Sequence, residues 1–267
     1  MSKSLDIIRL LQQKRKYLLN GDDTNGICYD GFVNEEVYDM QRFKVAVLLK
    51  ETNGNDTSGN TSVSRNDWLY NYWIRHQQAE AEPEICKTKT GDVYVKEDAF
   101  YSSTYRKLCL WLAMLFDLLE ETYSGIEKYF VNGSVNISKV RKVLHRVAVI
   151  NLKKSWGTAV TDFDTLQNYL DGPQILQTIE KQLFDYIAPQ IVLCGSADVF
   201  NIACKKFSGN EIESEQADLF GKPYRVAKIR NTLFVCMYHP NYQNGKSDIQ
   251  YAQYAEELFL FALSHLK

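Results

Sequence analysis

The sequence predicts an α/β fold, a three-layer α/β/α sandwich with a central, mostly parallel four-stranded sheet. Four short apolar runs support this prediction, at residues 43–49, 147–150, 190–194 and 231–238. Such runs, apolar on both faces, are typical of strands buried between two layers of helices. Segments with helical spacing separate the runs, and strands that alternate with helices form parallel sheets.

Helical spacing, capping residues and turn residues predict the remaining elements. Ser102 or Ser103 caps the most apolar helix, and Ser247 caps the last one. Asp171-Gly172-Pro173 interrupts a helical region, and Thr90-Gly91-Asp92 forms the turn of a small hairpin over residues 87–95. The predicted helices cover residues 5–19, a short stretch from residue 34, and residues 67–78, 105–121, 136–146, 164–187, 197–207 and 247–265.

The composition predicts a single domain without a membrane span. With 267 residues, 45% of them hydrophobic, the chain has enough apolar material for a full core. No repeat or clear linker divides it, so we expect one domain over residues 1–267, with an N-terminal helical segment to about residue 42 and an insertion over about residues 55–100. The absence of an apolar signal core and of a long apolar run predicts a cytoplasmic protein. The six cysteines include no C-x-x-C pair, which favours reduced, buried thiols over a disulfide or a metal site.

Polar residues follow all four predicted strands. Glu51 follows the first strand, Asn151 the second, Gly195 and Ser196 the third, and His239 the fourth. Ligands of open α/β sheets bind outside the carboxyl ends of the strands, so these residues form a candidate catalytic set. Each residue alone is weak support, because a strand-end Asn is often a turn former and a single His is more often structural. The sequence has no phosphate-binding loop, dinucleotide-binding, nucleophile-elbow or zinc-protease motif.

The order of these strand ends resembles that of the uracil-DNA glycosylase superfamily. Lys50-Glu51-Thr52-Asn53-Gly54 resembles the first-loop motif G-E-x-P-G, and Ala148-Val149-Ile150-Asn151 resembles L-L-L-N. Cys194-Gly195-Ser196 resembles W-G-S, and His239-Pro240-Asn241-Tyr242 resembles H-P-S-P. The resemblance is confined to the strand ends between about residues 44 and 242. A lysine replaces the first glycine, Asn53 replaces the proline, and the iron–sulfur cysteines of some branches are absent.

The resemblance implies a DNA glycosylase that needs no cofactor or metal and acts on a base extruded from duplex DNA. Glu51 would orient or deprotonate the attacking water, with Asn53 as a second candidate for holding it. His239 would donate a hydrogen bond to the departing base. Asn151 would read the pyrimidine edge, and the orientation of its amide would suit either cytosine or uracil.

Aromatic and basic residues complete the predicted DNA interface. Trp68 and Tyr72 are candidates for stacking on the base, although aromatic residues at helical spacing more often belong to a core. Tyr242 lies where the family inserts a wedge into the vacated stack. Lys153, Lys154 and, by the resemblance, Ser196 are expected to contact DNA beside the site. A net charge of −2 neither indicates nor excludes such an interface. Further basic candidates, which are more simply solvated surface, are Lys139, Arg141, Lys142, Lys222, Arg225, Lys228 and Arg230.

Gly54 bears on the substrate. The uracil-specific branch has a bulky Tyr at the matching place, which excludes substituents at pyrimidine C5. The resemblance therefore implies room for a 5-modified pyrimidine, such as glucosylated hydroxymethylcytosine in phage DNA, and a role in antiviral defence. The alternatives are a uracil-DNA glycosylase of base-excision repair, a hydrolase of free nucleosides and a non-catalytic nucleic-acid-binding protein. No obligate protein partner is expected.

Overall fold

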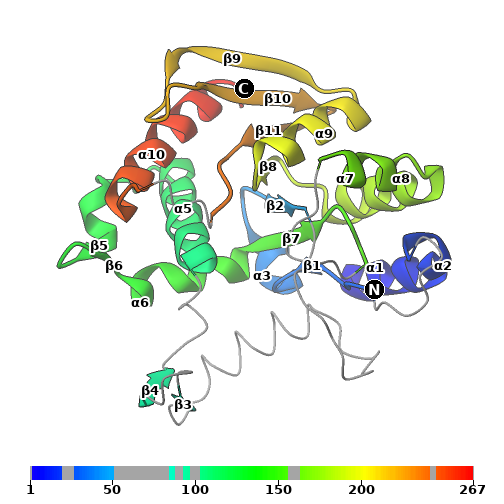
Figure 1. Cartoon of the computed structure of the whole chain (residues 1–267), viewed down its shortest axis with the longest axis horizontal. Coiled ribbons are helices and arrows are strands. Elements are labelled where there is room, and N and C mark those ends of the chain that lie inside the picture. The colour runs from blue at the N-terminus through cyan, green and yellow to red at the C-terminus, as the bar shows by residue number, and fades with distance from the viewer. Residues whose placement is uncertain are drawn as a thin grey trace.

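The structure, a computed structural model, describes residues 2–19, 27–50, 84–87, 93–96, 103–155, 163–240 and 245–266. At its centre is a seven-stranded sheet with the strand order β1-β7-β2-β8-β11-β10-β9 (Figure 1). The strands are β1 (Gly31–Phe32), β2 (Val45–Leu49), β7 (Val147–Asn151), β8 (Ile191–Cys194), β9 (Asn210–Ala217), β10 (Pro223–Ile229) and β11 (Thr232–Cys236). The four neighbouring strands β7, β2, β8 and β11 are parallel, and the outer strands pair antiparallel.

The predicted α/β class is confirmed, but the predicted number of four strands is wrong. The four predicted strands form the parallel centre, and β1, β10 and β9 extend the sheet at its two edges. β9 carries Glu211, Glu213 and Glu215 and is mostly exposed, so no apolar run marks it in the sequence. Charged residues are common on edge strands because they discourage pairing with another chain. Buried apolar runs therefore identify the centre of this sheet and miss its edges.

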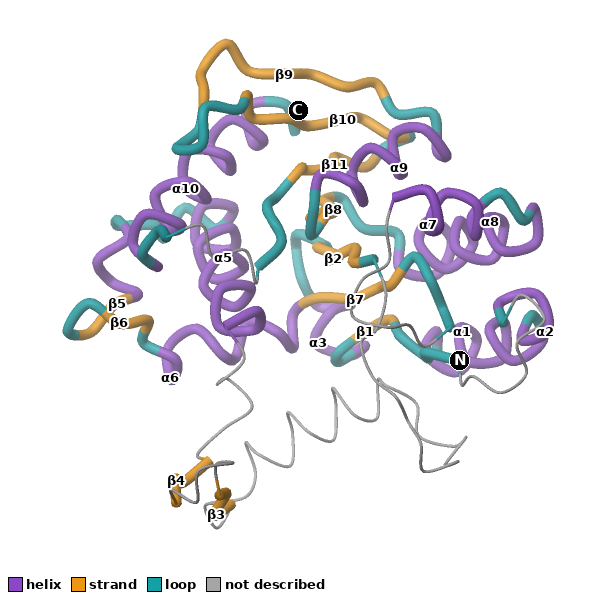
Figure 2. Tube along the Cα trace, in the orientation of Figure 1, coloured by secondary structure: helices purple, strands orange, loops and turns teal. Residues whose placement is uncertain are grey.

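Helices cover both faces of the sheet (Figure 2). The α-helices are α1 (Lys3–Gln13), α2 (Arg15–Leu18), α3 (Glu35–Met40), α5 (Ser103–Leu119), α6 (Ile137–Val140), α7 (Phe163–Leu170), α8 (Pro173–Glu180), α9 (Ala197–Phe207) and α10 (Asp248–Ser264). The 3-10 helices are η2 (Ile126–Tyr129) and η3 (Arg141–Arg146), and η4 (Lys181–Ile187) is a π-helix. Two small hairpins lie outside the sheet, β3 (Glu84–Lys87) with β4 (Val93–Lys96) and β5 (Phe130–Val131) with β6 (Ser134–Val135).

The alternation of side chains along β2 separates two cores. Val45 and Val47 join the core that contains α5 and α10, whereas Ala46 and Leu48 join the core that contains α7, α8 and α9. Successive residues of a strand point to opposite faces, so a strand apolar at every position fits only between two helical layers. The three layers predicted from the sequence follow from this pattern.

Most predicted helices are confirmed, and their ends follow the expected capping. The Ser247 side chain and Gln250 form a capping box at the start of α10. The break predicted at Gly172 and Pro173 separates α7 from α8. The helix predicted over residues 136–146 is instead a short α-helix followed by the 3-10 helix η3. The helix predicted over residues 67–78 lies outside the described residues.

The N-terminal helices pack onto the sheet as part of the second core. Leu11 of α1 and Leu18 of α2 are fully buried there, together with Leu166 and Leu170 of α7. None of the described helices combines the length and the apolar character needed to cross a membrane.

Candidate functional site at the carboxyl edge of the sheet

The four parallel strands end at one edge of the sheet. Leu49 is level with Asn151 on β7, and Leu48 is level with Cys194 on β8. The pairing continues just past the strands, because Leu152 N–H donates to the Leu49 carbonyl at 2.9 Å and Gly195 N–H donates to the Leu48 carbonyl at 2.9 Å. Asn151, Ser196 and His239 therefore follow the same edge, as the strand order requires.

Gly195, which follows the third predicted strand, lies against the end of β2. A Cβ atom at this position would lie 2.6 Å from Leu49 Cδ2 and 3.5 Å from the Leu48 carbonyl oxygen. Glycine is needed there because the backbone passes directly against the end of β2.

Ser196, predicted to contact DNA, caps the following helix. Its Oγ accepts a hydrogen bond from Val199 N–H at 3.2 Å, which satisfies one free amide at the start of α9. Ser196 is half-buried at the sheet edge. The cap fixes where α9 begins, and a contact with DNA stays a prediction.

A buried polar cluster surrounds Asn151, and its centre is a residue that the sequence did not single out. We call it the Asp30 cluster; its members are Cys28, Asp30, Asn151, Lys154 and Gln182. The Lys154 Nζ lies 2.5 Å from Asp30 Oδ1, and the two side chains are 0% and 1% exposed. Gln182 Nε2 donates to the same oxygen at 2.8 Å and to the Asp30 carbonyl at 2.8 Å.

The second carboxylate oxygen of Asp30 binds Asn151. The backbone N–H of Asn151 donates to Asp30 Oδ2 at 2.6 Å, and its side-chain Nδ2 donates at 3.1 Å. A carboxylate offers about four acceptor positions, so these bonds and those from Lys154 and Gln182 saturate Asp30. Removing two charges from water costs on the order of several kcal/mol per ion. A complete set of bonds, such as the set around Asp30, is needed to offset this cost.

The prediction that Lys154 contacts a DNA phosphate is wrong. Its side chain is fully buried against Asp30 and presents no charge at the surface. Residue type and position beside Asn151 suggested a DNA contact, but they could not show on which side of the chain the ammonium lies. Lys153 is half-buried at the sheet edge, where its backbone N–H donates to the Lys50 carbonyl at 2.9 Å.

Two buried oxygens of the cluster have no hydrogen-bond partner among the described residues, Gln182 Oε1 and Asn151 Oδ1, and only Asn151 is the last residue of a parallel strand at the carboxyl edge. Asn151 is 3% exposed, and its Oδ1 has no hydrogen-bond partner among the described residues. Leaving a buried acceptor unpaired costs about 1–3 kcal/mol, so such atoms are rare and call for a cause. An acceptor of this kind, at the edge where α/β proteins bind ligands, is suited to receive a donor from a ligand.

His239 is exposed at the same edge, three residues beyond β11. Desolvation by the surrounding protein, and then the positive charge of Lys50, lower the pKa of His239 below its ordinary value. Lys50 itself forms an ion pair with Asp198 of α9, with a distance of 2.5 Å between Nζ and Oδ2. The lowered pKa favours the neutral form of His239 at neutral pH, and a neutral imidazole carries one N–H.

Six of the predicted site residues lie outside the described residues. They are Glu51, Asn53, Gly54, Trp68, Tyr72 and Tyr242. Of the predicted set, the structure thus brings Asn151, Lys153, Ser196 and His239 to one sheet edge and buries Lys154 behind it. The missed members of the cluster, above all Asp30 and Gln182, belong to no motif and are far from Asn151 in the sequence.

Arg225 of β10 and Arg230, which directly follows β10, both form ion pairs within the protein. Arg225 forms ion pairs with Glu211 and Glu213 of β9, and its guanidinium lies over the Phe200 ring. Arg230 pairs with Glu180 at 3.0 Å. These contacts make β10 a weaker candidate for binding phosphate than the carboxyl edge of the sheet.

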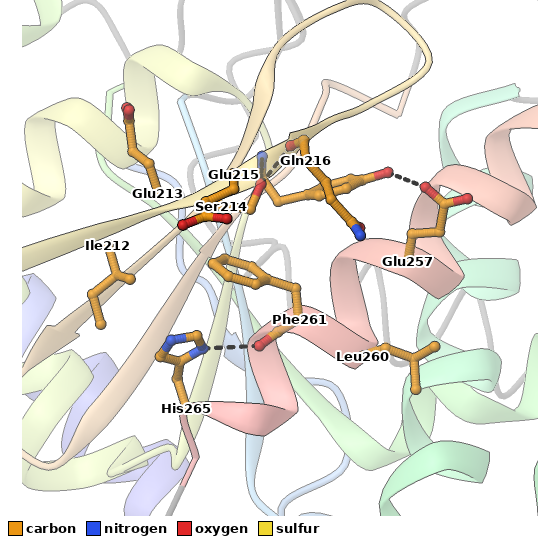
Figure 3. A pocket seen from close by; sticks show the side chains of 10 residues that line it. Ile212, Glu213, Ser214, Glu215, Gln216, Glu257, Leu260, Phe261 and His265 are labelled. Atoms are coloured by element: carbon orange, nitrogen blue, oxygen red, sulfur yellow. Dashed lines mark hydrogen bonds between the residues drawn. The ribbon is translucent and has the colours of Figure 1, made fainter.

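A cavity of about 500 Å³ lies elsewhere, between β9 and the end of α10 (Figure 3). Glu213, Glu215 and Glu257 line it, and the Tyr224 hydroxyl donates to Glu257. His265 Nδ1 lies 2.9 Å from the Phe261 carbonyl oxygen at its other side. Three carboxylates repel phosphate, so this cavity does not suit a nucleic acid.

No protein-family model matches the chain, and no curated protein is significantly similar to it. The chemistry of the sheet edge must therefore support any function by itself.

Proposed function

We propose that this protein is a DNA glycosylase with a uracil-DNA glycosylase-like fold. It hydrolyses the N-glycosidic bond of a pyrimidine flipped out of DNA and leaves an abasic site. The substrate base is 5-modified, such as glucosylated hydroxymethylcytosine in phage DNA, which fits a role in antiviral defence. The observation that carries this proposal is the buried Asn151 Oδ1, unpartnered among the described residues, at the carboxyl edge of the parallel strands.

The spacing of the strands supports a ring-sized ligand between Asn151 and His239. β7 and β11 are separated by β2 and β8, and neighbouring strands lie about 4.8 Å apart. The ends of β7 and β11 are therefore roughly 14 Å apart, which leaves room for two side chains and one ring. Asn151 and His239 would then approach the base from different sides.

The lowered pKa of His239 supports its part in catalysis. Cleavage of the C–N bond leaves negative charge on the departing base and positive character on the sugar. A neutral imidazole donates a hydrogen bond to the base as this charge develops, and a bond that strengthens in the transition state accelerates the reaction. Lys50 supports the neutral form by opposing a second positive charge nearby.

Glu51 and Asn53 complete the proposed mechanism as predicted from the sequence. Glu51 follows Lys50 directly, so the water that it orients would attack from the end of β2. Gly54 would leave the C5 side of the pyrimidine open to a substituent. Trp68, Tyr72, Lys153, Ser196 and Tyr242 stay proposed contacts to the base or to DNA.

A base-release assay tests the proposal. Duplex oligonucleotides that carry glucosylated hydroxymethylcytosine, hydroxymethylcytosine, cytosine or uracil are incubated with the protein, and abasic sites are counted after alkaline cleavage. We expect release of the glucosylated base, with a large loss in Asn151→Ala and none in Asn168→Ala, an exposed amide on α7. Release of uracil alone would instead make the protein a repair glycosylase.

Two controls separate the remaining functions. Glu51→Gln should slow base release greatly and leave DNA binding nearly intact, whereas a non-catalytic binder would be unaffected in every assay. DNA binding should weaken steeply as salt rises, because released counterions contribute to phosphate binding. Cleavage of free nucleosides without any dependence on salt would show a nucleoside hydrolase.

A further inference from the structure

We infer that Asp30 is a positioning residue that holds the Asn151 amide in one orientation, so that the site offers its ligand a hydrogen-bond acceptor and no donor. The identity of the ligand as a pyrimidine rests on the proposed function. The fixed orientation of the Asn151 amide does not rest on it. The consequence is a preference for a base that carries an amino group at the edge facing Asn151.

The chemistry of the cluster determines the orientation of the amide. Asp30 forms an ion pair with the Lys154 ammonium, and a carboxylate only accepts hydrogen bonds. The side-chain atom of Asn151 that lies 3.1 Å from Asp30 Oδ2 is therefore the amide nitrogen. With the amide reversed, two acceptor oxygens would face each other in a buried site, and neither would provide a hydrogen for the other.

Both hydrogens of the amide nitrogen have acceptors within the cluster. Asp30 Oδ2 takes one, and the Cys28 sulfur lies 3.7 Å from Nδ2, within the range of a weak acceptor. The amide thus keeps no hydrogen for a ligand. Its oxygen points away from Asp30 and has no partner among the described residues.

The cluster holds Asp30 from three segments of the chain. Asn151 N–H comes from the end of β7, Lys154 from the residues after it, and Gln182 from the π-helix η4. π-Helical turns are rare and are often found at functional sites. Because all three segments belong to the packed second core, Asp30 has little freedom to release Asn151.

An acceptor alone distinguishes between pyrimidine edges. The 4-amino group of a cytosine ring donates to Asn151 Oδ1, whereas the 4-carbonyl of uracil is an acceptor and faces another acceptor. Uracil can donate only its N3–H, and this contact places a carbonyl oxygen on each side of the Asn151 oxygen, whereas the amino group of cytosine has one ring nitrogen beside it. One neutral hydrogen bond contributes about 0.5–1.5 kcal/mol, which corresponds to roughly 2- to 13-fold in favour of the amino-bearing base.

Hydrogen exchange of the Asn151 side-chain amide tests its fixed orientation independently of function. In the full-length protein labelled with ¹⁵N-asparagine, we expect slow hydrogen exchange for the Asn151 side-chain amide and fast exchange for the exposed Asn168. The test variant is Asp30→Asn combined with Lys154→Met, which removes the charge pair without leaving one charge buried alone. The Asn151 amide should exchange much faster in this variant, and unchanged slow exchange would overturn the positioning role.

The ratio of the affinities for two modified bases tests the expected preference for a base with an amino group. Single-stranded oligonucleotides with hydroxymethylcytosine or hydroxymethyluracil as the one modified base are titrated against the wild type and the double variant. We expect the wild type to prefer hydroxymethylcytosine by about 2- to 13-fold and the variant to lose most of this preference.

The outcomes separate this inference from the proposed function. An equal affinity of the wild type for both probes, or an unchanged ratio in the variant, would overturn the specificity role of Asp30. Preference for hydroxymethylcytosine without any base release would leave the inference supported and the glycosylase proposal refuted. A merely structural role of Asp30 would change stability and both affinities together, but it would not change their ratio.

Discussion

The Asp30 cluster and the β9–β10 edge of the sheet, where Arg225 pairs with Glu211, use the same types of charged residue in opposite ways. At the Asp30 cluster, one carboxylate and one ammonium are buried and every acceptor position of the carboxylate is filled. At the β9–β10 edge, Arg225 and Glu211 remain 22% and 33% exposed and share their charges with water. A buried charge must be held by specific partners, whereas an exposed charge needs none. Precise positioning of a side chain is therefore expected at the first region and not at the second.

The largest expected effect comes from breaking the buried pair. Asp30→Asn leaves the Lys154 ammonium buried without a countercharge, and this type of change costs about 3–5 kcal/mol in the free energy of unfolding. Urea denaturation followed by circular dichroism measures the change. Since Lys154→Met together with Asp30→Asn removes both charges, the double variant should recover most of the loss. Equal stability of the single and double variants would contradict a tight pair.

A second prediction concerns the end of β2. Gly195→Ala would place a Cβ 2.6 Å from Leu49 Cδ2, and overpacking of this kind costs about 1–3 kcal/mol. The end of the Leu49 side chain can move, so the lower part of this range is expected. Thermal unfolding measures the effect, and Leu49→Ala in the Gly195→Ala background should relieve the overlap. A fully stable Gly195→Ala protein would show that β2 and β8 are less closely packed at this edge.

The pH dependence of base release gives a third prediction. The pKa of His239 is lowered, so its neutral form persists below the ordinary histidine range. Activity that needs neutral His239 is present above this lowered pKa and is lost as the pH falls through it. Lys50→Met removes a positive charge, which raises the pKa and moves the acid limb of the pH–rate profile to higher pH.

Lys205→Met is the matched control for that experiment. Lys205 lies on the exposed side of α9 and bonds to Gln167, away from His239. Its removal should leave the acid limb in place. An acid limb that moves equally in both variants would show a general effect of net charge rather than the local effect of Lys50.

The smallest expected effect is at the β9–β10 edge. Glu211→Gln weakens the exposed pair with Arg225, and pairs of this kind contribute about 0–1 kcal/mol to stability. The difference from the wild type should shrink further at 1 M salt, where the screening length is about 3 Å. A loss as large as that of Asp30→Asn would remove the contrast between the two regions.

The sequence predicted the centre of the fold well because that part depends on local patterns. Residues 147–150 are apolar at every position, and such a run is stable only between two helical layers. The sequence predicted the edges poorly. β10 carries Arg225 and Lys228 among apolar residues, and these charges indicate a solvated surface in the sequence, whereas the pairing with β9 and β11 shows a strand.

The sequence by itself determined that strand ends carrying Asn151, Ser196 and His239 meet at one edge, since parallel strands joined by helices must point the same way. Only the tertiary structure decided which side chains are buried behind that edge. Asp30 and Gln182 lie 121 and 31 positions from Asn151 in the chain, and no periodicity or motif relates residues so far apart. Burial decided their role, because a charge removed from water must be paired where the fold places it, and Lys154 is therefore bound to Asp30 instead of facing solvent.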